Sequence, residues 1–222
     1  MEAQEQAKQV AGRAAAAVVA DGMKVGLGTG STVRYAIEAL GETGFDLTCV
    51  ATSSATEELA GRVGLRLVAP DEALHLDVTI DGADEVDAAL NLTKGGGGAL
   101  TREKVVAAMA DRFVVVADRS KVVALLGPFG TPIEVLPFAP GVVGERLRAL
   151  GAGAVHRRDG LSDNGGVILH AQFGEIADPV GLAAELSAIP GVVEHGIFLA
   201  DLVSTVVVAD PDGTIEVLGQ PL

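Results

Sequence analysis

Short apolar segments alternate with helix-length segments through the first 126 residues of this chain. The apolar segments that we expect to form strands are residues 25–27, 47–51, 65–68, 78–80 and 113–117. This alternation is typical of a parallel sheet with helices on its faces, because parallel strands need a crossover connection between them. The sequence therefore predicts an α/β protein with a Rossmann-like parallel sheet, preceded by an alanine-rich helix over residues 2–20.

The pattern changes after Gly127-Pro128. Strands are expected at 133–136, 154–157, 167–173 and 192–198, and helices from Pro140 and from Pro179. This β-α-β-β-α-β order is that of the ferredoxin-like split unit. The apolar runs 202–209 and 215–218 form a last hairpin that we expect to rejoin the first domain. The predicted division is a Rossmann-like domain of residues 1–127 plus 202–222 and a smaller ferredoxin-like α+β domain of residues 128–201.

The composition excludes several classes of protein. The net charge is −14 over 222 residues, which argues against a nucleic-acid surface because such a surface needs a basic stripe. The one cysteine, Cys49, lies in an apolar run, so the chain can form neither a disulfide framework nor a cysteine-rich metal site. The apolar run 14–20 is too short to span a bilayer, and no basic segment marks a targeting signal. We expect a cytoplasmic protein with no membrane or nucleic-acid partner.

The stretch from Asp77 to Lys104 combines features that an ordinary core does not need. It carries in order the expected strand 78–80, Asp81, Asp84, Lys94, the glycines Gly95 to Gly98, and Glu103. Glu103 falls near the start of a helix that we expect from about Ala99. Open α/β sheets bind ligands at the carboxyl ends of their strands, and the N–H groups of a glycine run before a helix favour anions. This stretch is therefore the candidate active site.

Asp81 and Asp84 lie three residues apart in a turn that contains glycine, so both can face one pocket. Crowded carboxylates separate each other's pKa values, and such a pair can move protons between oxygen atoms. The alternative is a turn in which Asp serves as the hydrogen-bonding residue. The spacing does not match a calcium loop, in which the ligands alternate, and we predict no metal site.

Lys94, the glycine run and Glu103 each have a chemical and a structural interpretation. A buried Lys94 could stabilise an oxyanion, and the glycines let the backbone approach a ligand closely. In the first helical turn the dipole favours an ionised Glu103, which could act as a general base. The structural alternatives are a flexible connector and simple compensation of the helix dipole.

Gly28-Thr29-Gly30-Ser31-Thr32 follows the first expected strand and opens a helix to about Leu40. It is not a dinucleotide fingerprint, because Ser31 stands where the third glycine would be, and it lacks the Gly-Lys-Ser/Thr of a Walker loop. A glycine turn with three hydroxyls at a helix N-terminus can bind a phosphate. It can equally be a tight turn with Ser31 or Thr32 as the N-cap, and the loop alone favours neither interpretation.

Polar groups also follow two other predicted strands. Thr52-Ser53-Ser54 forms a second hydroxyl cluster, and Lys121 adds a basic group just past the strand 113–117. Lys8, in the first helix, is expected on its own to be a solvated charge.

Five motifs occur in this order: Gly28-Thr29-Gly30-Ser31-Thr32, Asp81-Gly82-Ala83-Asp84-Glu85, Lys94-Gly95-Gly96-Gly97, Leu100-Thr101-Arg102-Glu103-Lys104 and Ala117-Asp118-x-Ser120-Lys121. Together they resemble ribose-5-phosphate isomerases of the A type, and the resemblance covers essentially the whole chain. It implies a Rossmann-like domain with a small ferredoxin-like domain, in a homodimer or homotetramer. It also implies interconversion of D-ribose 5-phosphate and D-ribulose 5-phosphate in the non-oxidative pentose phosphate pathway, without a cofactor.

The resemblance also implies roles for single residues. Glu103 would be the base that moves a proton between C1 and C2 through an enediolate, and Asp81 would help to open the ring and exchange protons with the sugar oxygens. Asp84 and Lys94, with the amides of the glycine run, would hold the reacting end. The implied substrate-binding residues are Thr29, Gly30, Ser31, Thr32, Asp81, Gly82, Ala83, Asp84, Lys94, Gly95, Gly96, Gly97, Lys121 and Lys8.

Two positions depart from the family pattern. Arg119 stands where a small residue is usual, so the surroundings of Lys121 are expected to differ, and Gly98 stands where alanine is common. Two other functions are alternatives. A non-catalytic sugar-phosphate sensor would keep the phosphate loop, but the chain has no helix-turn-helix or basic segment. A deaminase or lactonase acting on sugar phosphates would need a placed histidine, and all four histidines lie away from the glycine motifs in the sequence.

Overall fold

The computed structural model describes residues 2–222, which fold into two compact units. The first unit comprises the chain up to Ala83, Arg102–Val122 and Asp201–Leu222. The second comprises Asp84–Thr101 and Val123–Ala200. The sequence predicts residues 84–101 in the first domain, whereas the structure groups them with the second unit, because two short strands in this segment form a sheet with a strand near residue 197.

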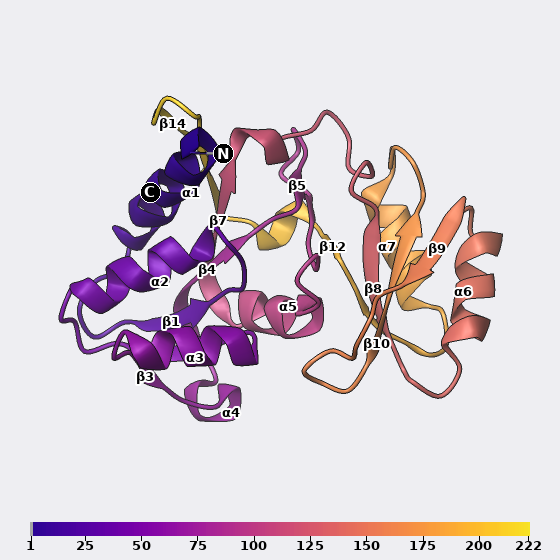
Figure 1. Ribbon diagram of the computed structural model, residues 1–222, viewed down its shortest axis with the longest axis horizontal. Helices are drawn as coiled ribbons and strands as arrows, with labels where there is room; N and C mark the ends of the chain where they lie inside the picture. The colour runs from indigo at the N-terminus through magenta and orange to yellow at the C-terminus, as the bar shows by residue number, and fades with distance from the viewer. Residues whose placement is uncertain (1) are drawn as a thin grey trace. The chain divides into compact units, whose positions relative to one another are not determined.

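The first unit is built on a seven-stranded sheet in the order β14-β13-β7-β4-β1-β2-β3 (Figure 1). Its strands are β1 (Lys24–Leu27), β2 (Thr48–Ala51), β3 (Arg66–Leu67), β4 (Leu76–Gly82), β7 (Ala110–Asp118), β13 (Thr205–Ala209) and β14 (Ile215–Gly219). Each neighbouring pair is parallel except β13 and β14. The Rossmann-like α/β fold predicted from the alternation is therefore confirmed.

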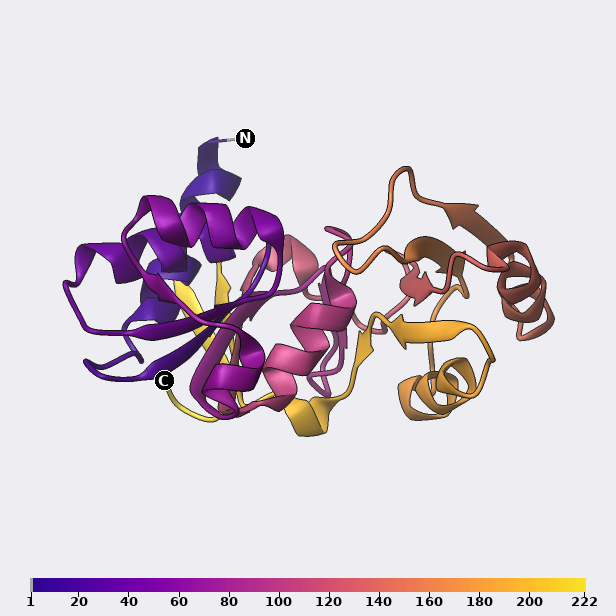
Figure 2. The ribbon, with the colours of Figure 1, turned by 90° about the horizontal axis from the view of Figure 1, so that it is seen from below.

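Helices cover both faces of this sheet. They are α1 (Glu2–Ala16), α2 (Val33–Glu42), α3 (Ser54–Arg62), α4 (Pro70–Ala73) and α5 (Leu100–Ala108). On one face α1, α2 and α3 bury a core that includes Val25, Leu27 and Ile80. On the other face α5 packs through Val106 (Figure 2), where Thr79 Oγ1 donates to the Val106 carbonyl (3.0 Å).

The second unit contains a four-stranded antiparallel sheet in the order β11-β8-β10-β9. Its elements are β8 (Thr131–Val135), α6 (Pro140–Ala149), β9 (Ala154–Arg157), β10 (Val167–Gln172), α7 (Pro179–Ser187) and β11 (Val192–His195). This is the predicted β-α-β-β-α-β order, and Ile133, Leu147 and Leu186 are fully buried between sheet and helices. The ferredoxin-like prediction is confirmed.

Several local predictions differ from the structure. The first helix ends at Ala16 and not near residue 20, and the expected strand 192–198 is divided at Gly196 into β11 and β12 (Ile197–Phe198). Gly196 is required there because a Cβ would lie 2.1 Å from the carbonyl oxygen of Lys94. The sequence did not predict β5 (Glu85–Val86) or β6 (Leu92–Thr93), which form a three-stranded sheet with β12. Among residues 2–222, no helix is long and apolar enough to span a membrane.

Candidate active site

The first unit gathers its candidate residues where β1 and β4 lie side by side. β2 and β3 extend the sheet on one side of this pair, and β7 and β13 extend it on the other. The chain thus reverses its direction across the sheet between β1 and β4, and open α/β folds bind ligands outside the carboxyl ends of the strands at such a point. The loop of residues 28–32 follows β1, and Asp81 lies near the end of β4.

Asp81 is fully buried and fixed against the loop that follows β1. Its Oδ1 accepts hydrogen bonds from the backbone N–H of Thr29 (3.1 Å) and of Gly82 (2.7 Å). A Cβ on Gly28 would lie 2.1 Å from the same oxygen, so only glycine lets the loop approach this closely. The structure therefore brings together two motifs that are about fifty residues apart in the sequence.

The side chain of Thr29 belongs to a cluster of hydroxyl groups. Its Oγ1 lies 2.8 Å from Thr52 Oγ1, 2.7 Å from Ser53 Oγ and 3.0 Å from Thr56 Oγ1. Thr56 in turn donates to the carbonyl oxygen of Gly28 (2.8 Å). These bonds tie the loop after β1 to the segment after β2. We infer that the Thr29 hydroxyl holds the loop in shape, a role that its place in the motif did not indicate.

Ser31 and Thr32 stand at the start of α2. Thr32 occupies the N-cap position, but its backbone is helical. Its side chain makes no capping hydrogen bond within the part of the chain that the structure describes. Gly30 and Ser31 are exposed, and Gly30 has a positive φ of +140°. The capping interpretation of these hydroxyls therefore finds no support at Thr32. An uncapped helix N-terminus with adjacent hydroxyls is the arrangement that binds a phosphate.

Glu103 lies in the first turn of α5 and is only 4% exposed. It shares a helix face with Val106, three residues on, which packs against the sheet at β1 and β4. Because α5 connects the parallel strands β4 and β7, its N-terminus returns from the carboxyl end of β4. Glu103 and Asp81 therefore belong to the same edge of the sheet in the first unit.

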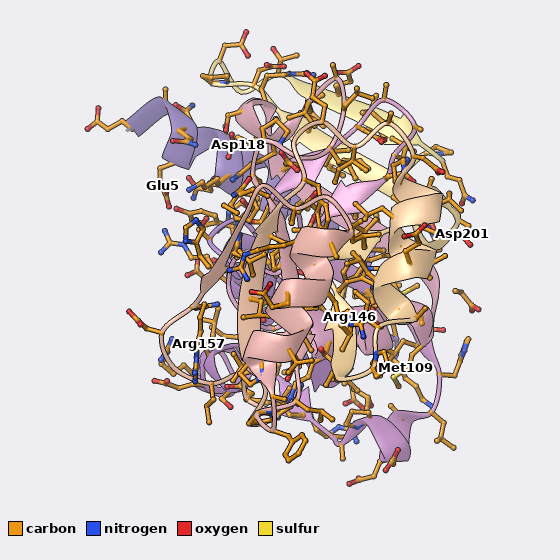
Figure 3. All side chains as sticks on the ribbon, turned by 90° about the vertical axis from the view of Figure 1, so that its right-hand side faces the viewer. Glu5, Met109, Asp118, Arg146, Arg157 and Asp201 are labelled. Carbon is orange, nitrogen blue, oxygen red and sulfur yellow. The ribbon has the colours of Figure 1, made fainter. Side chains whose placement is uncertain are left out.

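The end of β7 adds Asp118 and the 3₁₀ turn Arg119–Lys121. Asp118, labelled in Figure 3, is 3% exposed and accepts a hydrogen bond from the Ser120 N–H (3.0 Å) through Oδ1. None of the residues that the structure describes bonds its buried Oδ2. Lys121, the predicted phosphate ligand, is the last residue of this turn and is partly exposed.

Arg119 turns toward the last hairpin of the first unit. It donates to both carboxylate oxygens of Asp210 (2.9 and 2.8 Å) and forms an ion pair with Glu216 (2.7 Å). These hydrogen bonds raise the pKa of Arg119 above its ordinary value and lower the pKa of Asp210. The departure from the family pattern at position 119 is thus accommodated by two carboxylates.

Lys8 takes part in an ion-pair network near the surface. Its Nζ lies 3.6 Å from Glu5, which also accepts hydrogen bonds from Tyr35 (2.6 Å) and Arg34 (2.6 Å). The hydrogen bond from Tyr35 is the largest cause that lowers the pKa of Glu5. Because Arg34 and Tyr35 lie in the first turn of α2, the network ties Lys8 to the helix that follows the glycine loop.

In the second unit, Asp84 and Lys94 flank the glycine run. Asp84 Oδ2 accepts a hydrogen bond from the Gly96 N–H (2.8 Å). Lys94 is 2% exposed, its N–H donates to the Gly196 carbonyl (2.8 Å), and its Nζ lies 5.3 Å from the centre of the Phe198 ring. A lysine ammonium over an aromatic face is stabilised by a cation–π interaction.

The neighbouring carboxylate Glu85 has a structural role. It is buried and accepts hydrogen bonds from Thr93 Oγ1 (2.8 Å), the Gly127 N–H (2.9 Å) and the Phe129 N–H (2.7 Å). It thereby anchors the segment that leads into β8. The ring of Phe129 also lies over the glycine run, 2.8 Å from where a Cβ on Gly96 would be.

One histidine lies closer to the glycine run than the sequence suggests. His170 of β10 packs edge-on against Phe129, the ring that lies over the glycine run, with ring centres 5.3 Å apart. The pairing of β10 with β8 brings it there. Burial lowers the pKa of His170, against the opposing effect of Asp84.

Among residues 2–222, no group of three or more histidine, cysteine, aspartate or glutamate side chains is arranged to hold a metal ion. Cys49 is buried in β2, and burial raises its pKa to about 12, which disfavours the reactive thiolate.

Comparison with known proteins identifies close relatives. The ribose 5-phosphate isomerase A (phosphoriboisomerase A) family profile matches residues 48–213. A protein named ribose-5-phosphate isomerase A from Rhodopseudomonas palustris (strain TIE-1) is 50% identical, over 96% of this chain and 98% of the relative. One of the same name from Methanosarcina acetivorans is 48% identical, over 95% and 93%.

Solved structures agree with these sequence relatives. The structure of ribose 5-phosphate isomerase A from Methanocaldococcus jannaschii has a TM-score of 0.91 at 38% identity, over 98% of this chain and 100% of that one. A D-ribose-5-phosphate isomerase in complex with phospho-erythronic acid has a TM-score of 0.93 at 38% identity, over 97% and 99%.

Proposed function

The chain belongs to the ribose-5-phosphate isomerase A family and is an isomerase, and from this premise we propose that it interconverts D-ribose 5-phosphate and D-ribulose 5-phosphate through an enediolate. The observation that carries the proposal is the contact between Asp81 and the loop after β1. It fixes a buried carboxylate beside an uncapped helix N-terminus, at the point of the sheet where such folds bind ligands. A sugar phosphate carries the phosphate and the ionisable oxygens that these two features suit.

We assign the proton transfer to Glu103. In the open-chain aldose its carboxylate takes the proton from C2, and the C–H electrons form the C1–C2 double bond while negative charge develops on O1. Return of the proton to C1, with transfer of the proton from O2 to O1, gives the ketose. The first turn of a helix favours the charged form that a base needs, and general-base catalysis contributes about 10²–10⁴-fold.

The other carboxylate and the lysine complete the proposed chemistry. Asp81 serves ring opening and the exchange of protons with the sugar oxygens. Asp84, Lys94 and the amides of the glycine run bind the reacting end, and Lys94 supplies positive charge to the oxyanion. The burial of Lys94 supports this role, because a charge held out of water interacts more strongly with a developing anion.

For the phosphate we propose Ser31, Thr32, the N-terminus of α2 and Lys121, with Gly30 giving the backbone access. Lys8 joins them through its link to α2. A related isomerase has been solved with phospho-erythronic acid, a phosphorylated sugar acid, which supports a phosphate-bearing ligand of this size. We further propose, from the family relationship, a role in the non-oxidative pentose phosphate pathway, a cytoplasmic location and a homodimer or homotetramer.

The test of the function is proton exchange in D₂O. The purified protein, treated with a chelator, is incubated with ribose 5-phosphate, and ribulose 5-phosphate and deuterium at C2 of the aldose are followed by NMR. We expect conversion with solvent deuterium appearing at C2. Conversion without deuterium would point away from a base in exchange with water, and binding without conversion would support a sugar-phosphate sensor.

Lys121→Ala tests the proposed phosphate contact. Loss of a hydrogen bond to a charged group costs about 1.5–3 kcal/mol, so we expect KM to rise by about 10- to 100-fold with little change in kcat. Steady-state kinetics with ribose 5-phosphate measure both constants. Lys24→Ala is the matched control, because Lys24 begins β1 at the opposite end of the strand and donates to the Ala73 carbonyl. Equal KM values for the two variants would separate Lys121 from the phosphate.

A further inference from the structure

Arg158 contacts the glycine run from the hairpin that follows β9. Its Nη1 donates to the carbonyl oxygen of Gly96 (3.2 Å). The same nitrogen occupies the space beside Gly98, where a Cβ would lie 2.3 Å from it. The backbone of Arg158 is itself fixed, because its N–H donates to the Ile168 carbonyl (2.9 Å) and continues the ladder between β9 and β10.

Gly96 is therefore held through both of its backbone groups. Its N–H donates to Asp84 Oδ2 (2.8 Å), and its carbonyl oxygen accepts from Arg158. The run cannot fix its own orientation by side-chain packing, and Gly95 and Gly98 have positive φ angles of +104° and +85°. The Gly98 N–H also donates to the Gly95 carbonyl (2.8 Å) and closes a turn, and within this turn the two contacts set how the peptide between Gly96 and Gly97 is oriented.

The orientation of that peptide sets the direction of one donor. In a planar trans peptide the carbonyl oxygen and the following N–H point in opposite directions. Because Arg158 binds the Gly96 oxygen, the Gly97 N–H must point away from Arg158. Among residues 2–222 no group accepts a hydrogen bond from this N–H, and Gly97 is exposed.

We propose that Arg158 is a positioning residue that turns the Gly96–Gly97 peptide so that the Gly97 N–H is presented to the oxyanion formed during isomerisation. The inference rests on the proposed function. Without Arg158 the peptide can rotate, and the carbonyl oxygen would then face the developing negative charge and repel it. A preorganised N–H donor stabilises such charge most when it needs no reorientation at the moment of reaction.

The charge distribution around the loop fits this assignment. Asp84 and Arg158 both bond Gly96, and they act in opposite directions on the pKa of His170, which Asp84 raises and Arg158 lowers. The peptide groups of Gly96 therefore contact one positive side chain, Arg158, and one negative side chain, Asp84.

The test compares Arg158→Met with Arg157→Met. Methionine keeps an unbranched side chain without its charge or donors, and Arg157 is the exposed neighbour in β9 (Figure 3). For Arg158→Met we expect kcat to fall by about 10- to 100-fold with KM for ribose 5-phosphate within about twofold, since an oxyanion donor is misdirected. Arg157→Met should leave both constants unchanged. Arg158→Lys should recover part of kcat, because lysine can still donate to the carbonyl.

A second measurement reports the loop without catalysis. Amide hydrogen exchange of residues 95–98, followed by mass spectrometry, should become faster in Arg158→Met and stay unchanged in Arg157→Met. An unchanged kcat in Arg158→Met, or equal losses in the two variants, would overturn the inference while the wild-type protein still isomerises. A wild-type protein that binds ribose 5-phosphate without converting it would instead refute the proposed function.

Discussion

Glu103→Gln is expected to abolish turnover while ribose 5-phosphate still binds. The amide keeps the size and shape of a side chain that is only 4% exposed, but it cannot accept the proton from C2. Removal of a general base lowers the rate by about 10²–10⁴-fold, so we expect kcat to fall by about 10²-fold or more. Kinetics of ribulose 5-phosphate formation measure the loss, and isothermal titration calorimetry measures the remaining affinity.

The matched control is Glu57→Gln. Glu57 also lies in the first turn of a helix, α3, but it is exposed. If both glutamates only compensate helix dipoles, the two substitutions should lower thermal stability by similar small amounts and leave kcat unchanged. Deuterium exchange at C2 separates the interpretations further, because it should disappear in Glu103→Gln alone. Retained exchange in that variant would remove Glu103 from the role of base.

The parts of the site that the sequence predicts well are those attached to strand ends. The apolar run 78–80 predicts that Asp81 lies near the carboxyl edge of a buried sheet, and the run 25–27 predicts the same for the loop that begins at Gly28. Parallel strands present their carboxyl ends at one edge, which allows the two motifs to come together. The hydrogen bond from the Thr29 N–H to Asp81 Oδ1 (3.1 Å) joins them.

Several features of the second unit could not be predicted from sequence patterns. β5 and β6 have two residues each, too short for any periodicity. They pair with each other, and β6 also pairs with β12, which lies more than one hundred residues later in the chain. Their pairing moves residues 84–101 into the second unit. Likewise nothing local indicates that His170 contacts Phe129 or that Arg158 contacts Gly96, because both contacts depend on how β9 and β10 pair.

The directions in which the side chains of the loop point also could not be predicted from the sequence. The three hydroxyls of the loop at residues 28–32 look equivalent in the motif, yet Thr29 bonds three interior hydroxyls while Ser31 is exposed. The one signal was the second hydroxyl cluster after the adjacent strand, at Thr52 and Ser53. Hydroxyl-rich segments after two neighbouring parallel strands indicate mutual hydrogen bonding as readily as a shared ligand.

Gly28→Ala is expected to damage both stability and activity through one contact. The Cβ would lie 2.1 Å from Asp81 Oδ1 and 2.2 Å from its Cγ, so one of the two residues must move. Gly28 is held by its own N–H, which donates to the Ile80 carbonyl (2.9 Å), and by Thr56, which donates to its oxygen (2.8 Å). Asp81 is therefore the group that shifts, and it loses its hydrogen bond from Thr29.

Overpacking of this kind costs about 1–3 kcal/mol of unfolding free energy, and misplacing a catalytic group by about 1 Å costs about 10²-fold in rate. Denaturant unfolding and kcat measure the two effects. Gly61→Ala in α3 is the control, because nothing lies within 4 Å of the added methyl group and the change should be neutral or stabilising by up to about 1 kcal/mol. Wild-type kcat in Gly28→Ala would mean that the reaction does not depend on where Asp81 is held, and the chemistry would then rest on Glu103 and the second unit's residues alone.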